Sequence, residues 1–272
     1  MKYKAIASDL DGTLFNSKME LSEENLKAIE EISKLGVEFV PATGRTLAEI
    51  YPAILENPNI RYIIYSNGSA IWDKKENKHT YMCMSREVSN SILDMLSSYE
   101  VHITVRAMGK TFVNKKTQRE EVRDYNRVSP YHRIVLDNHA ERIDNFDTFI
   151  HGLDNVEVFS VFFHDDAEYA ECKKKLSERV DISFATTLAH NVEIFSVNSG
   201  KGKAIDALAE LLGASANEII AVGDSHNDMT MIRAAGLGLA TANANEDLKG
   251  AADRIISSND EHIADYILKN IL

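Results

Sequence analysis

The chain has 272 residues, of which 44% are hydrophobic and 26% charged, as is typical of a folded soluble protein with one large domain or two smaller ones. Its 42 acidic and 30 basic residues give a net charge of -12, which argues against nucleic acid or an anionic membrane as the main partner. The apolar runs are too short to span a bilayer or to form a signal peptide, and the two cysteines form no CxxC pair, so we expect a cytoplasmic protein with free thiols.

Short apolar runs and amphipathic segments alternate over the first quarter of the chain. Strands are predicted at 3–9, 37–43 and 62–67, with one helix between Ser22 and Gly36 and a second helix from about Leu47. Ser22 is a typical N-cap residue, two acids follow it, and Gly36 is a typical helix stop. The strand–helix alternation predicts a parallel sheet with helices on its faces.

A different pattern follows, and the opening one then returns. We predict a hairpin from 70–73 and 79–84, helices at 87–98 and 167–178, and strands at 102–105, 156–163 and 182–186. After these come strands at 192–197, 219–223, 237–240 and 254–257, a helix ending at Gly213 and another at 227–235. The predicted fold is therefore α/β. Residues 1–83 and 189–272 form a Rossmann-like, doubly wound parallel-sheet core, and residues 84–188 form an inserted α/β cap domain.

Asp9 and Asp11 stand two residues apart where the first predicted strand ends, in the sequence DLDGT. Gly12 allows the backbone to turn tightly there. One carboxylate could act as a nucleophile or metal ligand while the other transfers a proton. A calcium loop is excluded because its sixth position needs glycine and holds Leu14 here. A plain Asp-Gly turn without chemistry is left open.

Further polar residues fall where later strands end or helices begin. They are Thr43, Gly44 and Arg45, Lys201 and Lys203, and Asp224, Asn227 and Asp228. Ligands of open α/β sheets bind at the carboxyl ends of strands, so Asp9, Thr43 and Asp224 are expected at one edge. Left open are an ordinary turn at Thr43, an exposed Arg45 and an acidic helix start at Asp224.

Taken in order, these motifs resemble those of the haloacid dehalogenase-like phosphohydrolases, most closely the Cof-type branch with a C2 cap. The resemblance covers essentially the whole chain. It implies Asp9 as nucleophile and Asp11 as general acid and base, with Thr43 and Lys201 completing the catalytic set. In the family a lysine precedes glycine at the head of this helix, which selects Lys201 over Lys203.

The resemblance also implies a set of ligand-binding residues. Mg²⁺ would be held by Asp9, the backbone carbonyl of Asp11, and Asp224, with Asp228 either orienting metal-bound waters or ligating directly. Phosphate binding would fall to residues of all four motifs: Leu10, Thr43, Gly44, Lys201 and Asn227.

The expected function is that of a Mg²⁺-dependent phosphatase acting on small phosphorylated metabolites, such as sugar phosphates, through an aspartyl-phosphate. The expected assembly is a monomer or small homo-oligomer. A phosphomutase on the same core is an alternative that the sequence does not separate. A receiver-like signalling module is disfavoured because it is much shorter and lacks an acid at the position of Asp11. A non-catalytic phospho-metabolite-binding protein is disfavoured because every acid and the lysine are present.

Overall fold

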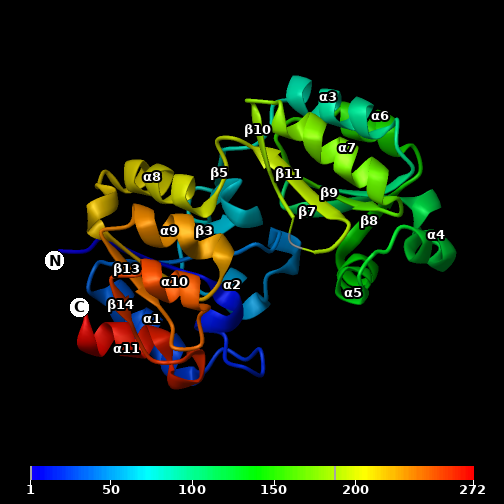
Figure 1. Cartoon of the computed structure of the whole chain (residues 1–272). Coiled ribbons are helices and arrows are strands. Elements are labelled where there is room, and N and C mark those ends of the chain that lie inside the picture. The colour runs from blue at the N-terminus through cyan, green and yellow to red at the C-terminus, as the bar shows by residue number, and fades with distance from the viewer. Residues whose placement is uncertain (1, 187) are drawn as a thin grey trace. The chain divides into compact units, whose positions relative to one another are not determined.

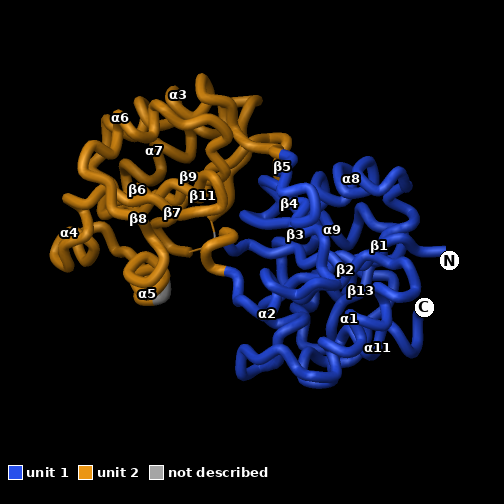
Figure 2. Tube along the Cα trace, turned by 180° about the vertical axis from the view of Figure 1, so that it is seen from behind, with its two compact units in different colours: residues 1–45, 50–80, 200–272 blue, residues 46–49, 81–199 orange. Residues whose placement is uncertain are grey.

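The computed structural model describes residues 2–186 and 188–272, which fall into two compact units (Figure 2). Unit 1 consists of the chain up to Arg45 together with Ile50–Thr80 and Gly200–Leu272. Unit 2 consists of Thr46–Glu49 and Tyr81–Ser199.

Unit 1 is built on a five-stranded parallel sheet with the strand order β14-β13-β12-β1-β2. Its strands are β1 (Ala5–Ser8), β2 (Glu38–Pro41), β12 (Ile219–Gly223), β13 (Leu237–Ala240) and β14 (Arg254–Ile255). Every residue of β1, β12 and β13 is buried, as expected for strands covered on both faces. The predicted parallel core is therefore confirmed.

Helices cover both faces of this sheet (Figures 1 and 2). On one side lie α1 (Glu23–Lys34) and α11 (Ile263–Asn270), and on the other lie α8 (Lys201–Leu212), α9 (Met229–Ala234) and α10 (Glu246–Ala251). Ser22 caps α1 as predicted, because its side chain accepts a hydrogen bond from the Asn25 backbone at 3.2 Å.

One prediction for the region after β2 is wrong. The helix expected from about Leu47 is only a single 3-10 turn, Leu47–Glu49, followed by the four-residue α2 (Pro52–Leu55). Tyr51 is extended because the proline after it disfavours helical backbone at the preceding residue.

The expected strand 62–67 ends early, as β3 (Tyr62–Tyr65). It pairs antiparallel with β4 (Ala70–Asp73), next to β5 (Lys78–Tyr81), and meets the parallel sheet at one bridge, Ala42 to Ile64.

Unit 2 contains a six-stranded sheet with the order β10-β11-β9-β6-β7-β8, antiparallel except between β7 and β8. The strands are β6 (Val101–Ala107), β7 (Lys110–Asn114), β8 (Ala140–Ile143), β9 (Val156–Phe163), β10 (Ile182–Ala185) and β11 (Asn191–Ser196). The helices are α3 (Arg86–Leu96), α4 (Glu120–Tyr125), α5 (Pro130–His139), α6 (Phe146–His151) and α7 (Asp166–Ser177). Helices α3, α6 and α7 contribute Leu93, Ile150 and Leu176 to its main hydrophobic core.

The predicted domain boundaries differ from those of the structure. The sequence predicts the strand at 192–197 as part of the core, but this segment forms β11, which pairs with β9 and β10 in unit 2. Unit 2 therefore runs from Tyr81 to Ser199 instead of 84–188, and it also includes Thr46–Glu49. Ala48 and Glu49 are joined to unit 2 by hydrogen bonds to the carbonyl of Gly109 and from the hydroxyl of Thr111.

Among the residues that the structure describes, no helix has the length and apolar character that crossing a membrane requires.

Candidate active site

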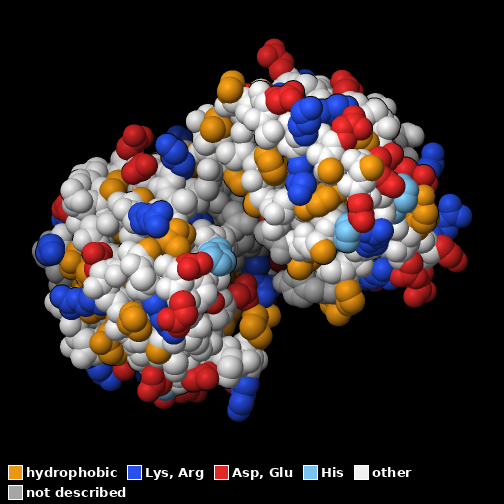
Figure 3. Space-filling model, in the orientation of Figure 1, with side chains coloured by type: hydrophobic (Ala, Val, Ile, Leu, Met, Phe, Trp, Pro, Cys, Tyr) orange, Lys and Arg blue, Asp and Glu red, His pale blue; other side chains and the backbone are white. Residues whose placement is uncertain are grey.

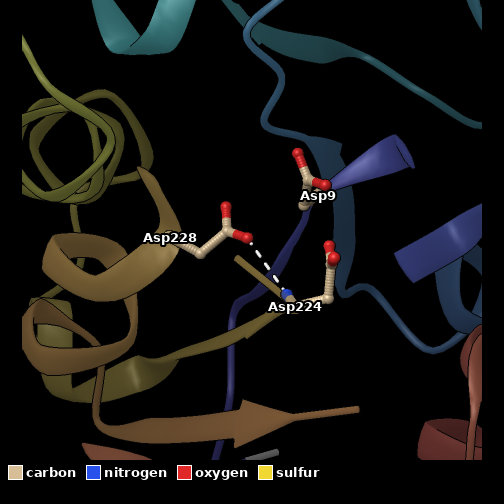
Figure 4. Close-up of side chains that lie close together, drawn as sticks. All are labelled: Asp9, Asp224 and Asp228. Carbon is tan, nitrogen blue, oxygen red and sulfur yellow. Dashed lines mark hydrogen bonds between the residues drawn. The ribbon is translucent and has the colours of Figure 1, made fainter. Parts of the chain in front are cut away.

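The ends of β1 and β12 bring Asp9 and Asp224 together. The two strands are parallel neighbours in register, with Ser8 opposite Val222, and each acid directly follows its strand. The Asp9 amide donates to the Val222 carbonyl at 3.0 Å. Figure 4 shows the carboxylates of Asp9, Asp224 and Asp228 around one space, and one oxygen of each lies within 4.8 Å of the others.

The tight turn Leu10–Leu14 after β1 is shaped around Asp224. Gly12 has a φ of 79°, and a Cβ at this position would lie 2.7 Å from Asp224 Oδ2. Thr13 donates its hydroxyl to Asp224 Oδ1 at 3.0 Å. The glycine is therefore required both for the backbone conformation and for the close approach of the carboxylate.

Lys201, the first residue of α8, lies between two of the acids. Its side chain is completely buried, and Nζ lies 2.6 Å from Asp9 Oδ1 and 2.6 Å from Asp228 Oδ1. Burial alone would lower the pKa of Lys201, but the attraction of Asp228 and Asp9 raises it above its usual value, so the ammonium form is held. The competing Lys203 is exposed.

For two of the neighbouring acids, burial shifts the pKa in the direction that favours the neutral form. Burial raises the pKa of Asp9 well above its ordinary value, although Lys201 opposes this, and the neighbouring Asp228 raises it further. Burial and the charge of Asp228 also raise the pKa of Asp224. Three clustered carboxylates around one ammonium leave an excess of negative charge, and a bound cation would offset it.

Asp228 is fixed by protein donors on both of its oxygens. Oδ1 accepts from Lys201, and Oδ2 accepts from the backbone amides of Asp224 at 3.0 Å and Ser225 at 3.1 Å. The residue is fully buried. These bonds favour a role in holding the loop and Lys201 in place over direct ligation of a metal.

Asp11 and Arg45 form a two-pronged ion pair. Arg45 Nε donates to Asp11 Oδ2 at 2.8 Å, and Nη2 donates to Oδ1 at 2.7 Å. Only 19% of the Arg45 side chain is exposed, so Arg45 is not the exposed arginine that the sequence left open.

Three of the expected phosphate-binding residues, Thr43, Gly44 and Asn227, lie next to a residue that sequence reasoning missed. Asn67, with a φ of 54°, donates its amide to the Thr43 carbonyl at 3.0 Å, and its side chain accepts from Asn227 Nδ2 at 3.1 Å. A Cβ on Gly44 would lie 2.9 Å from Asn67 Oδ1. The only sequence signal was an Asn-Gly pair, which is typical of any turn. The side chain of Leu10 is buried, so only its backbone can face a ligand.

Comparison with known proteins agrees with this geometry. The family model of the haloacid dehalogenase-like hydrolases matches residues 6–267. The chain is 31% identical to phosphatase YwpJ of Bacillus subtilis over 99% of this chain and 100% of that protein. It is 27% identical to the B. subtilis 5-amino-6-(5-phospho-D-ribitylamino)uracil phosphatase YwtE, over 99% and 98% of the two chains. The structure of a haloacid dehalogenase-like hydrolase from B. subtilis, 28% identical, superposes with a TM-score of 0.77 over 99% of this chain and 100% of that one. The chain therefore belongs to the haloacid dehalogenase-like hydrolases and, within them, to the Cof-type phosphatases.

Proposed function

We propose that the protein hydrolyses phosphomonoesters of small metabolites, with Mg²⁺ as cofactor and an aspartyl-phosphate on Asp9 as intermediate. The observation that carries the proposal is the buried Lys201 ammonium, 2.6 Å from the Asp9 carboxylate at the carboxyl edge of the parallel sheet. Burial raises the pKa of Asp9, and the Lys201 ammonium acts against that rise, so this contact favours the ionised, nucleophilic form of the acid.

The first half-reaction transfers the phosphoryl group to Asp9. A carboxylate oxygen of Asp9 forms a bond to phosphorus while the ester P–O bond breaks, and Asp11 gives its proton to the departing alcohol oxygen. Lys201, Thr43 and Asn227 would bind the phosphoryl oxygens, whose negative charge needs preorganised donors.

The second half-reaction restores the enzyme. Asp11, now a carboxylate, takes a proton from a water whose oxygen attacks phosphorus, and the P–O bond to Asp9 breaks. Inorganic phosphate leaves, and both acids return to their starting states.

The carboxylate cluster fits a hard divalent cation. Asp9, Asp224 and the backbone carbonyl of Asp11 would hold Mg²⁺, with Asp228 outside the direct ligands. When bound, the ion would neutralise the negative charge that the acids and the phosphoryl group bring together. On the face in Figure 3, acidic and basic side chains are interspersed. Because the chain has a net charge of -12, we assign the attraction of an anionic substrate to the site itself.

We assign the role of the cap, which reads the organic part of the substrate, to unit 2. The ribityl phosphate named for YwtE is one candidate substrate, and sugar phosphates are a second class.

Phosphate release tests the proposal. The panel contains sugar phosphates, nucleotides, phosphorylated cofactors and the substrate of YwtE, each with Mg²⁺ and with chelator. Asp9→Asn, which keeps the size of the side chain, is the control. Metal-dependent turnover that is lost in the control is expected. No turnover from folded, Mg²⁺-replete protein would contradict a phosphatase, and activity only with a sugar bisphosphate activator would indicate a phosphomutase.

A further inference from the structure

The carboxylate of Asp11 is held by one guanidinium group. Both carboxylate oxygens accept from Arg45, at 2.7 and 2.8 Å, in a parallel fork, which is the most directional form of a charged hydrogen bond. Among the described residues, no other side chain donates a hydrogen bond to Asp11. Arg45 is therefore the group that selects the conformation of the Asp11 side chain.

Arg45 is itself held firmly within unit 1. Its amide donates to Thr43 Oγ1 at 3.1 Å, and its carbonyl accepts from the Ser66 amide at 2.9 Å. Its guanidinium lies over the ring of Tyr51, 5.0 Å from the ring centre. An arginine fixed at the backbone and at the head of the side chain is a rigid support.

Asp11 needs such a support. It lies in the turn Leu10–Leu14, and 40% of its side chain is exposed, so packing alone does not fix its rotamer. A general acid acts only within hydrogen-bond reach of the atom that it protonates. A misplacement of about 1 Å can lower a rate by about 10².

We propose that Arg45 is the positioning residue of the general acid and base, acting on the reaction through Asp11. The inference rests on the proposed function, because it gives Asp11 its proton-transfer role. The fork occupies one lone pair of each carboxylate oxygen, and a second lone pair on each can carry the transferred proton. The fork uses both Nε and Nη2 of Arg45 on Asp11, which favours this role over direct binding of the phosphoryl group.

The test compares two leaving groups by kcat/KM, which reports the steps up to release of the alcohol. An alkyl phosphate, such as a sugar 6-phosphate from the panel, needs a proton on its leaving oxygen. p-Nitrophenyl phosphate needs almost none. For Arg45→Ala we expect a loss of about 10- to 100-fold on the alkyl phosphate and little loss on the aryl phosphate. Arg45→Lys, which keeps the charge but not the fork, should show the same selectivity and serves if the alanine variant does not fold.

A double-variant cycle separates the alternatives. In an Asp11→Asn background, Arg45→Ala should cause no further loss, because its effect passes through Asp11. Equal losses on both substrates, with weaker inhibition by inorganic phosphate, would overturn the inference and make Arg45 a phosphate ligand. Unchanged kinetics in both Arg45 variants would overturn it while leaving the phosphatase intact. A wild-type enzyme inactive on both substrates would instead remove the proposed function and this inference with it.

Discussion

The ammonium group of Lys201 joins three segments that are far apart in the sequence: the end of β1, the start of α8 and the loop after β12. Taking charges out of water is costly, so a buried cluster of this kind is not retained for stability alone. It fixes the position of Asp9 and keeps a positive charge beside it. Loss of Lys201 should therefore affect both folding and activity.

The first prediction concerns Lys201→Met. It leaves two buried carboxylates without their shared partner, and breaking such a pair typically costs about 3–5 kcal/mol. Turnover should fall by about 10² or more, because a preorganised charge next to the proposed nucleophile is lost. Urea unfolding and phosphate release measure the two effects. Lys203→Met, an exposed site on the same helix, is the matched control and should change neither quantity. Wild-type stability in Lys201→Met would contradict the prediction.

The second prediction compares two glycines with left-handed backbone. Gly12→Ala brings strain of about 1–2 kcal/mol and places a methyl group 2.7 Å from Asp224 Oδ2. Gly213→Ala, at a φ of 59° with nothing within 4 Å of the new Cβ, brings only the strain. Gly12→Ala should therefore lose more stability than Gly213→Ala in urea unfolding, and only Gly12→Ala should lose phosphatase activity, by about tenfold or more. Equal activity in the two variants would show that the Asp224 position is not critical.

The sequence could place the proposed catalytic acids but not the residues that support them. The positions of Asp9, Asp224 and Lys201 follow from where strands end and helices begin, and this much can be predicted from hydrophobic pattern. The fork from Arg45 to Asp11 and the contact of Asn67 with Asn227 depend on side-chain direction after folding. Nothing in the local pattern around Arg45 or Asn67 encodes that direction.

At the level of elements, hydrophobic pattern predicted strands better than it predicted their partners. The segment that forms β11 reads as an apolar strand, and Val192 and Ile194 are indeed buried. An apolar run of that length suits a strand of a parallel core or the inner face of an antiparallel sheet equally well. Antiparallel pairing with β9 and β10 places this strand in unit 2, and such pairing depends on contacts between segments far apart in the sequence.

The third prediction concerns the contact that anchors β11. Asn191, its first residue, is fully buried and donates from Nδ2 to Ser160 Oγ and to the Val161 carbonyl, each at 3.1 Å. Asn191→Ala should destabilise unit 2 by about 1–3 kcal/mol, because buried polar groups on β9 lose a partner. Ser160→Ala removes only the hydroxyl partner and should cost less. Hydrogen exchange of the β9 and β11 amides measures both. Faster exchange in β1 and β12 as well would contradict an effect confined to unit 2.

On the scale of the whole molecule, the chain passes between the units four times, after residues 45, 49, 80 and 199. Unit 2 has its own hydrophobic core between its sheet and α3, α6 and α7. A unit with its own core can lose structure without the other, so unfolding of this protein need not be a single transition. Conditions that act on one unit should therefore separate the two.

Low pH is such a condition, because unit 2 buries a histidine that lies outside the candidate active site. His102 on β6 is fully buried, with Nε2 3.1 Å from Gln118 Nε2. Burial and the positive charge of Arg123 lower the pKa of His102 to about 4, from an ordinary value of 6.5. Between these two pH values the unfolded chain binds a proton that the folded chain does not. Stability should therefore fall as the pH drops from about 6.5 to about 4, by at most about 3.4 kcal/mol, and this source should add nothing below pH 4.

The fourth prediction isolates that proton with His102→Gln, whose side-chain oxygen can accept the bond from Gln118 without titrating. At pH 7.5 the variant should be less stable than the wild type, because the ring beside Phe162 is lost. As the pH falls to 4.5, the difference in free energy of unfolding between the two proteins should shrink. Only the wild type is destabilised by keeping a histidine uncharged in the folded state. Urea unfolding at each pH, with hydrogen exchange of the β6 amides to locate the change in unit 2, measures that difference. If the difference in free energy of unfolding between the two proteins stays constant with pH, His102 takes up its proton equally well in the folded and unfolded chains. Low pH would then not destabilise unit 2 through this residue.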